Sequence, residues 1–574
     1  MPSLNWIGKK DIKNHHNHVE YRIIDCKETI GESDSGNLIV KGDNLLALKA
    51  LLPYYAGKIK MIYIDPPYNT GSTSWIYNDA VDAPVIKKWL QNTVDSNDLS
   101  RTDKWLCMIY PRLKLLHQFL KEDGVIFISI DDAEVATLRL VMNEIFGKNN
   151  FIANFAWKKK STSTNVAGVQ VSSLFDNTLC YAKDSTFAPI KRRVTFKEDR
   201  KYPESDDEGN YRTSVIEKKN SGDYKRETML FEILGQKPRE GKRWQIGEAE
   251  ARRLEKKNRF FINENGIVKL KIYDFEDSDS ESAQPNFLDT HGSTDSASKV
   301  LKNIFGEDGV FPNPKPIELI EHFMKITCGR NDIIMDSFAG SGTTGHAVLD
   351  YNSKNKTTHK FVLIEMEDYA KKVTVERVKR VIEGYSFNGK TTVPLIEPIK
   401  ISMANLLNAK FTTKLQTEVE RIIEESSEKF DKIEKKFKDN TLEINGIKVI
   451  KESVKGLGGG FQYCELTEPL LDEYGLLSEH ITFEMLAKHI YFTEFGIALQ
   501  QNQISKEDYY AGRFKNKDLF IFMEKNFSLH DLEKIIQTEA EEYIIFADTW
   551  SISFDMLSKH KITIKRLPLE IKGV

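Results

Sequence analysis

The chain has 574 residues, of which 40% are hydrophobic and 29% are charged, and its formal net charge is −3. A chain of this length is too long for a single hydrophobic core, so we expect about three to four domains. The near-zero net charge excludes a globally basic nucleic-acid-binding protein, and any surface for a polyanion has to be local.

The five cysteines (Cys26, Cys107, Cys180, Cys328 and Cys464) are scattered along the chain without a Cys-x-x-Cys pair. This spacing argues against a disulfide framework and against a cysteine zinc site. There is no apolar N-terminal core of signal-peptide length and no run of about 18 apolar residues. We therefore expect a protein of the reducing cytoplasm.

Residues 1–30 are expected to form a polar N-terminal arm. They include His15, His16 and His18, but no carboxylate or cysteine lies at metal-ligand spacing around these histidines. We expect a solvated arm and no metal.

Residues 31–157 are predicted to form half of an open, doubly wound α/β sheet. A short strand at 38–40 leads into a helix that Asn44 can cap. Residues 72–103 lack periodicity and are expected to form a lid or a binding loop. The other predicted elements are strands at 59–64 and 125–130 and helices at 103–121 and 133–146.

The strand at 59–64 ends in the sequence Asp65-Pro66-Pro67-Tyr68. The prolines offer no backbone N–H, so the strand cannot continue through them. Asp65 is thereby placed at the carboxyl end of a strand, where open α/β sheets bind ligands. A carboxylate, free carbonyls and a ring suit a planar ligand with an amino group. A strand that simply ends in a Pro-Pro turn has the same pattern, so the motif alone leaves both interpretations open.

Residues 158–290 are polar and begin with Lys158-Lys159-Lys160. Residues 237–259 contain nine basic and four acidic side chains, with Trp244 among them. Basic groups neutralise phosphates and flat rings contact bases. A solvated charged face has the same composition, so the stretch by itself does not decide between the two.

Residues 291–390 contain a second strand-turn-helix pattern. The strand at 333–335 ends in Asp336, a glycine-rich turn follows, and the next strand at 361–364 closes with Glu365. The glycines allow the backbone to approach a ligand, and an acid at the next strand end can accept ribose hydroxyls.

The same turn contains a literal Gly-x-Gly-x-x-Gly, so an NAD-dependent oxidoreductase is a rival interpretation. Asp336 directly before the glycines argues against it, because this carboxylate suits a cationic or amino group better than a pyrophosphate. No hydride-transfer constellation accompanies the turn.

Residues 391–574 carry no recognisable chemistry and are expected to be a C-terminal α+β interaction region. Here we predict a helix at 414–438, a hairpin at 442–449 and a small β-α-β unit at 519–547. The segment 384–391 fits the P-loop pattern, but it leaves a helix and enters Thr-Val-Pro, so we expect a loop that does not bind ATP.

Asp-Pro-Pro-Tyr and, further on, Phe-Ala-Gly-Ser-Gly-Thr-Thr (338–344) resemble the two motifs of the amino-methyltransferases that act on exocyclic base nitrogens. The order, with the target motif first and the cofactor loop last, is similar to the beta class of DNA amino-methyltransferases. Gly42-Asp43-Asn44-Leu45, Lys242-Arg243-Trp244 and Phe311-Pro-Asn-Pro-Lys-Pro316 make it most similar to the modification (Mod) subunit of Type III restriction–modification systems.

The resemblance implies an α/β fold with a doubly wound mixed sheet, the S-adenosylmethionine-dependent methyltransferase fold in permuted order. It implies a catalytic half at 31–157, a target-recognition domain at 158–290 and a cofactor-binding half at 291–390. The catalytic residues it implies are Asp65, Pro66, Pro67 and Tyr68. The cofactor-binding residues it implies are Lys315, Asp336, Phe338, Ala339, Gly340, Ser341, Gly342, Thr343, Thr344 and Glu365. The DNA-binding residues it implies are Lys158, Lys159, Lys160, Lys242, Arg243 and Trp244.

The resemblance further implies direct methyl transfer, without a metal, to a base flipped out of double-stranded DNA. Asp65 in the first motif position favours adenine N6, and cytosine N4 is the alternative. Members of the family form dimers and associate with a separate helicase–nuclease (Res) subunit. A solitary adenine methyltransferase and a DNA-binding specificity subunit with an inactive site are the remaining alternatives.

Overall fold

The structure is a computed structural model that describes residues 4–69, 100–163, 170–188, 190–221, 225–472, 474–499 and 503–568. The chain divides into two compact units, one made of residues 1–190 and 286–574 and the other of residues 191–285. The loop predicted at 72–103 lies almost wholly outside the described residues.

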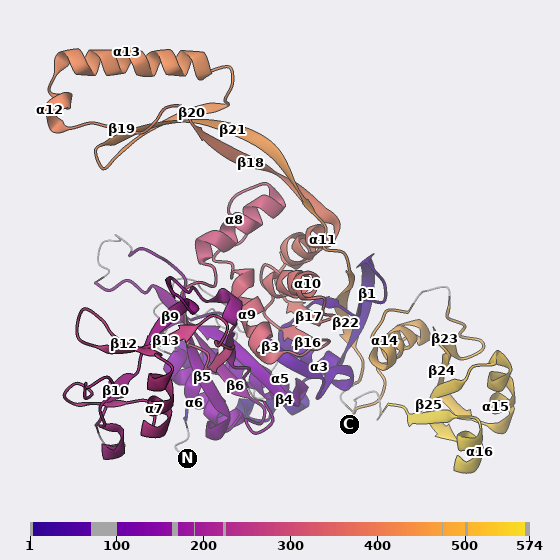
Figure 1. Cartoon of the computed structure of the whole chain (residues 1–574). Helices are drawn as coiled ribbons and strands as arrows, with labels where there is room; N and C mark the ends of the chain where they lie inside the picture. The colour runs from indigo at the N-terminus through magenta and orange to yellow at the C-terminus, as the bar shows by residue number, and fades with distance from the viewer. Residues whose placement is uncertain are drawn as a thin grey trace. The chain divides into compact units, whose positions relative to one another are not determined.

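A ten-stranded mixed sheet forms the centre of the first unit (Figure 1). Six neighbouring strands run parallel, and the sheet has antiparallel strands towards both edges. This arrangement confirms the predicted doubly wound mixed sheet. The strands, in spatial order, are β1 (Arg22–Gly31), β22 (Gly460–Pro469), β2 (Leu38–Lys41), β17 (Lys360–Glu365), β16 (Ile333–Asp336), β3 (Ile59–Ile64), β4 (Leu120–Ile130), β6 (Phe175–Ala182), β5 (Phe151–Lys158) and β15 (Phe287–Leu288).

Helices cover both faces of this sheet because successive strand residues point to opposite sides. Ile62 and Ile64 pack into one apolar cluster with the first group of helices, whereas Met61 and Tyr63 pack into a second cluster with the other group. The first group is α3 (Asn44–Tyr55), α5 (Arg101–Phe119) and α6 (Val135–Ile145). The second group is α8 (Thr294–Phe305), α9 (Ile317–Thr327), α10 (Thr343–Asn355) and α11 (Glu376–Glu383), the last preceded by the π-helical turn η5 (Ala370–Val375).

The N-terminal residues are not a solvated arm, so that expectation is wrong. The short helices α1 (Lys9–Ile12) and α2 (His15–His18) contact α5, and β1 is an edge strand of the central sheet. Trp6 and Ile12 join the apolar cluster, and His15 and His16 are buried. Two large apolar side chains thus dock this polar segment on α5. Among the described residues, no cluster of three or more potential metal ligands occurs.

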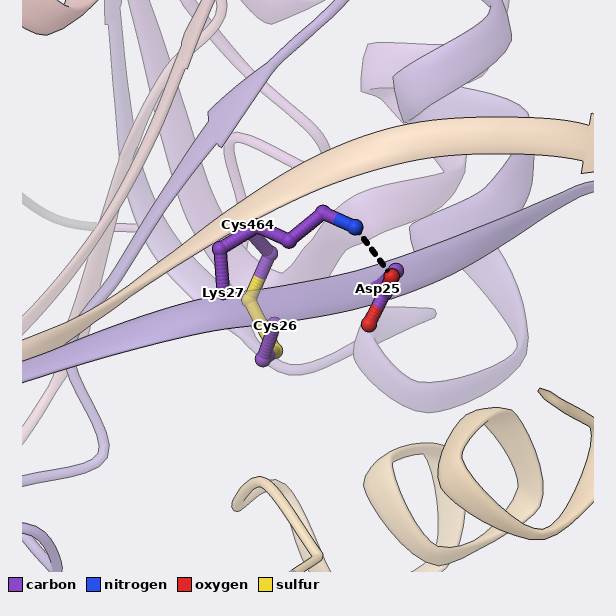
Figure 2. The surroundings of a disulfide bond; sticks show 4 residues. All are labelled: Asp25, Cys26, Lys27 and Cys464. Carbon is purple, nitrogen blue, oxygen red and sulfur yellow. Dashed lines mark hydrogen bonds and ion pairs between the residues drawn. A yellow bond between two sulfur atoms is a disulfide. The ribbon is translucent and has the colours of Figure 1, made fainter. Parts of the chain in front are cut away.

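A disulfide joins Cys26 of β1 to Cys464 of β22 (Figure 2). The scattered spacing argues against a disulfide framework, and this single bond is one that the spacing did not predict. The two residues are 438 positions apart in the sequence, but they are register partners in the antiparallel β1–β22 ladder. Spacing along the chain does not reveal such a pair. Cys107, Cys180 and Cys328 are buried and do not take part in this disulfide.

In its described residues, the second unit (191–285) has a four-stranded antiparallel sheet, two smaller strand pairs and one α-helix. Its core contains Trp244, Phe260, Ile216 and Ile233. Trp244 is fully buried, and its Nε1 donates to the carbonyl of Phe231 at 2.6 Å. The elements are β7 (Arg193–Thr195), β8 (Glu204–Asp206), β9 (Gly209–Val215), β10 (Glu217–Lys219), β11 (Lys242–Trp244), α7 (Glu248–Lys256), β12 (Phe260–Ile262), β13 (Val268–Tyr273) and β14 (Ser280–Ser282).

The segment after α11 differs from the prediction in three places. Residues 384–391 lie in β18 (Gly384–Pro394) rather than in a loop, and the predicted hairpin at 442–449 is part of one long strand, β21 (Thr441–Lys455). The predicted helix at 414–438 ends earlier, since α13 (Ala409–Ser426) is followed by β20 (Lys432–Lys438). β21 pairs with β18, β20 and the short β19 (Ile399–Lys400), which follows β18 and precedes α12 (Met403–Leu406). The pairs between β18 and β21 are non-local, and β20 and β21 form a hairpin whose turn lies at 439–440 rather than at the Asn-Gly sequence.

The last part of the chain contains the predicted β-α-β unit. The strands β24 (Lys517–Phe527) and β25 (Glu542–Trp550) are parallel, and α15 (Leu529–Ile535) connects them. The other elements here are α14 (Phe483–Phe495), β23 (Tyr510–Phe514), α16 (Phe554–Lys559) and β26 (Ile562–Arg566). Short 3₁₀ turns occur at η1 (Lys148–Asn150), η2 (Lys197–Asp199), η4 (Glu227–Met229) and η7 (Ile536–Thr538).

The five predicted domain ranges stay a prediction, and β22, within the range 391–574, is a strand of the central sheet. None of the described helices is both long enough and apolar enough to cross a membrane.

Trp244→Ala tests whether this side chain holds the core of residues 191–285. Removing a fully buried tryptophan costs about 3–5 kcal/mol, because contacts are lost and a cavity remains. In Trp244→Ala, hydrogen exchange measured on the full chain should accelerate throughout 191–285. Lys237→Ala, at an exposed position of the same unit, should leave the exchange rates at the wild-type level. Unchanged exchange in Trp244→Ala would contradict the core role.

Candidate active site

Three carboxylates meet at one edge of the central sheet. β16 lies between β3 and β17, and all three strands are parallel. Their carboxyl ends therefore lie side by side, and they carry Asp65, Asp336 and Glu365. The motifs around Asp65 and Asp336, far apart in the sequence, become neighbours through this strand order.

A cavity of about 650 Å³ lies at this edge, a volume typical of small-molecule sites. Residues of both predicted motifs line it. The lining residues that the sequence predicted are Asp65, Pro67, Lys315, Asp336, Phe338, Ala339, Gly340, Ser341, Thr343, Thr344 and Glu365. The structure therefore brings most of the predicted catalytic and cofactor-binding residues together in one cavity, whereas Pro66, Tyr68 and Gly342 are not among its lining residues.

Asp65 is held by two side chains within this cavity. The Tyr68 hydroxyl donates to Oδ1 of Asp65 at 2.7 Å, and Nζ of Lys315 donates to Oδ2 at 2.6 Å. Burial, together with the negative charge of Asp65, raises the pKa of Tyr68 well above its ordinary value. Tyr68 therefore stays protonated and remains a donor. The carbonyl of Pro67 accepts a hydrogen bond from Nε1 of Trp105 at 2.7 Å, which fixes the Pro-Pro turn.

The residue after this motif is anchored by a buried carboxylate that the sequence did not reveal. Asn69 has a φ of 61°, in the left-handed region that asparagine tolerates. Its Nδ2 donates to Oε1 of Glu134 at 2.7 Å, and the hydroxyl of Thr102 donates to the same oxygen at 2.7 Å. Glu134 thereby fixes the exit of the motif to the start of α6.

Asp336 closes the turn between β16 and α10. Its Oδ1 accepts from the backbone N–H of Phe338 at 3.0 Å, and its Oδ2 accepts from the Thr344 hydroxyl at 2.6 Å. Burial raises the pKa of Asp336 to about 7, and these two hydrogen bonds only partly oppose that effect. The carboxyl is thus poised between its charged and neutral forms near neutral pH.

Glu365 holds the glycine turn from the neighbouring strand. Its Oε2 accepts from the N–H of Gly340 at 2.7 Å, and its Oε1 accepts from the N–H of Glu367 at 3.0 Å. Gly340 and Gly342 both have left-handed φ values, of 51° and 78°. A Cβ at Gly342 would lie 3.0 Å from the carbonyl oxygen of Thr374, so only glycine fits this turn without strain.

Arg377 also holds the glycine turn, and its role was not identified from the sequence. Its Nη1 donates to Oγ of Ser341 at 2.9 Å and to Oγ1 of Thr343 at 2.8 Å. Burial lowers the pKa of Arg377 to about 9. In the sequence, Arg377 is one of several basic residues in the same helical segment, so no signal separates it from an exposed arginine.

Arg112 and Asn44, which the sequence also did not reveal as site residues, connect the start of α3 to the segment that leads into the glycine turn. Arg112 donates to Oδ1 of Asn44, and Nδ2 of Asn44 donates to the carbonyl of Ser337 at 3.3 Å. The cap of α3 is Asp43, which accepts from the N–H groups of Leu45 and Leu46, so the prediction that Asn44 caps this helix is wrong. Asn44 instead bridges the two halves of the sheet.

The residues predicted to bind DNA are not gathered at this cavity. Lys159 pairs with Asp176 at 2.7 Å, and Lys158 ends β5. Trp244 and Arg243 are buried within their own unit, so these two side chains do not offer an exposed surface to DNA. Nearby, Arg252 and Arg253 form ion pairs with glutamates of the same helix.

The cavity fits a nucleoside-type ligand that carries both positive and negative groups. Among its described lining residues are five carboxylates (Asp43, Asp65, Asp336, Glu365 and Glu367) and two cations (Lys315 and Arg112). The glycine turn and Glu365 suit a ribose, and the excess of carboxylates suits a sulfonium and an ammonium group. S-adenosylmethionine has all of these groups.

Asp336→Asn tests whether the pKa of Asp336 is raised. In the wild type, the free energy of unfolding should fall as pH rises from about 4 to 7, since the unfolded chain ionises Asp336 before the folded chain does. Each unit of pKa shift corresponds to about 1.4 kcal/mol. The stability of Asp336→Asn relative to wild type should therefore rise through this window and level off above pH 7. A pH-independent difference in urea unfolding would contradict the raised pKa.

Comparison with known proteins agrees with this geometry. The family model described as DNA methylase (N6_N4_Mtase) matches residues 59–376. The Type III restriction-modification enzyme EcoP15I Mod subunit of Escherichia coli is 31% identical over 430 residues, which cover 64% of this chain and 65% of that protein. The StyLTI Mod subunit of Salmonella typhimurium is 32% identical over 398 residues, covering 65% of this chain and 60% of that protein.

The match thus spans slightly less than two thirds of each relative's length. The solved structure of the PvuII DNA methyltransferase (cytosine-N4-specific) matches 62% of this chain and 90% of its own, with 14% identity and a TM-score of 0.34. The family match extends from the strand before Asp65 to the helix after Glu365, and it covers more than half of the chain. The chain belongs to the N6/N4 DNA methylase family.

Proposed function

We propose that the chain is a site-specific DNA methyltransferase that transfers a methyl group from S-adenosylmethionine to the N6 amino group of adenine. The observation that carries this proposal is the single cavity that contains both Asp65 and Glu365. A target base that enters beside Asp65 and Tyr68 lies next to the turn that would hold the cofactor. Transfer therefore needs no relocation of either substrate.

The residues around Asp65 supply the acceptor half of the reaction. Asp65 and the carbonyl of Pro66 accept hydrogen bonds from the target amino group, which directs the nitrogen lone pair towards the methyl group. The ring of Tyr68 stacks on the flipped base and offsets part of the cost of unstacking it. S-adenosylmethionine supplies the electrophilic methyl group when it is bound.

The residues around Glu365 hold the donor half. Glu365 accepts the ribose hydroxyls, while Asp336 and residues 338–344 enclose the methionine end. Lys315 pairs with the methionine carboxylate. Glu134 and Arg377 touch neither substrate and act as positioning residues for the two motifs.

We further propose that the chain acts as the modification and specificity subunit of a Type III restriction–modification system in the cytoplasm. The named Mod relatives and the inserted unit at 191–285 support this assignment. Its partners are double-stranded DNA, a second copy of the chain and a Res subunit. An N4-methylated cytosine product is the alternative, since the family includes both N6 and N4 enzymes.

Incubation of the protein with tritiated S-adenosylmethionine and mixed-sequence plasmid DNA tests the reaction. Nucleoside mass spectrometry should identify N6-methyladenine, and Asp65→Ala should lower the rate about a hundredfold or more, because the acceptor contact is lost. Long-read sequencing of the methylated plasmid then gives the recognition sequence.

Asp123→Ala is the matched control for this experiment. Asp123 is also bonded by a buried lysine, since Nζ of Lys60 lies 2.7 Å from its Oδ2, but it does not line the cavity. Asp123→Ala should therefore methylate DNA at the wild-type rate. Label on cytosine would contradict the adenine assignment, and undiminished label in Asp65→Ala would contradict the mechanism.

A further inference from the structure

The ammonium of Lys315 occupies the acceptor side of Asp65 that the proposed mechanism assigns to the target amino group. It donates to Oδ2 of Asp65 at 2.6 Å, and it is 5.1 Å from the centroid of the Tyr68 ring. A base that stacks on Tyr68 and donates its amino group to Asp65 would occupy the same volume. Lys315 and such a base therefore cannot be bonded to Asp65 in this way at the same time.

The contact between Lys315 and Asp65 is partly shielded from water, chiefly on the lysine side. Lys315 is 8% exposed, and the side chain of Asp65 is 26% exposed. The backbone of Lys315 is fixed on both sides, since prolines flank it and its carbonyl accepts from the Thr343 hydroxyl at 3.2 Å. A change of partner therefore requires only rotation of the long side chain about a fixed backbone.

A cofactor with a carboxylate would bring Lys315 an alternative partner in the same cavity. A ligand carboxylate among five protein carboxylates needs a cation. Arg112, the other cation of the described lining, is already bonded to Asn44 and to the carbonyl of Met108, the latter at 2.7 Å. Among the described residues, the side chain of Lys315 hydrogen-bonds to Asp65, and its backbone carbonyl accepts from Thr343 of the glycine turn.

We propose that Lys315 exchanges partners between Asp65 and the carboxylate of the bound cofactor, so that the target pocket opens for the base only after the cofactor has bound. This inference rests on the proposed function and adds an order of binding to it. Without cofactor, Lys315 fills the amino-group position. With cofactor, the carboxylate draws the ammonium away and leaves Asp65 free to accept the amino group of the base.

Calorimetric titration of the full chain tests whether Lys315 pairs with the cofactor carboxylate, and it needs neither DNA nor turnover. The two ligands are S-adenosylhomocysteine and its decarboxylated analogue. Wild type should bind the decarboxylated analogue about tenfold or more weakly, as expected for loss of a charged hydrogen bond. Lys315→Met should bind both ligands within about twofold of each other, because it has no cation to pair with the carboxylate.

Fluorescence of 2-aminopurine placed next to the target adenine, in a duplex with the mapped recognition sequence, tests the entry of the base, because the probe loses its stacking neighbour when the adenine flips out. In wild type, the fluorescence should rise only after S-adenosylhomocysteine is added. In Lys315→Met it should rise without S-adenosylhomocysteine, because nothing then blocks Asp65 and Tyr68. Lys60→Met, which removes an equally buried lysine paired with Asp123 outside the cavity, should behave as wild type in both assays.

Lys315→Gln provides a second variant if thermal unfolding shows that Lys315→Met does not fold. If Lys315→Met and Lys315→Gln still bound the decarboxylated analogue as much more weakly than S-adenosylhomocysteine as wild type does, the proposal would be overturned. A fluorescence rise that still requires S-adenosylhomocysteine in them would also overturn it. Failure of the proposed function is a different result, namely no methyl transfer to DNA by wild type while the ligand titrations remain as described.

Discussion

The whole site depends on the insertion of β16 between β3 and β17. Parallel neighbours end at the same edge of a sheet, so this strand order alone places Asp65, Asp336 and Glu365 around one cavity. The chain reaches β16 only after an inserted unit and several helices. That insertion leaves the edge intact because residues 191–285 form a core of their own around Trp244.

Three carboxylates at one edge are costly to bury, and the surrounding structure compensates each in a different way. Asp336 is held by backbone and hydroxyl donors, Glu365 by two backbone N–H groups, and Asp65 by a tyrosine and a lysine. The first two sets of donors belong to the turn that a cofactor would contact, so they remain in place on binding. The donors of Asp65 are side chains and can move. This contrast explains why the flexible step of the site is assigned to Lys315.

The elements that carry the two motifs were predictable from the sequence, because buried apolar strands followed by prolines or glycines give strong local signals. The contacts that complete the site were not. Arg377, Glu134 and the pair Cys26–Cys464 act across long sequence distances, and nothing in their local sequence distinguishes them. In the Lys432–Lys438 segment, by contrast, the local sequence gave a signal, but for the wrong element. Ile433 and Phe437 fit both a helical and an alternating pattern, and pairing with β21 decided in favour of a strand.

The central claim is that, within one cavity, Glu365 binds the cofactor and Asp65 binds the target amino group. The affinity for S-adenosylhomocysteine tests this claim most directly. The account predicts that Glu365→Ala weakens this affinity about tenfold or more, since the ribose loses its acceptor. It also predicts that Asp65→Ala binds at least as tightly as wild type, because Lys315 is then free for the carboxylate, although both variants methylate DNA more slowly than wild type. An equal loss of affinity in both variants, or an unchanged affinity in Glu365→Ala, would contradict the account.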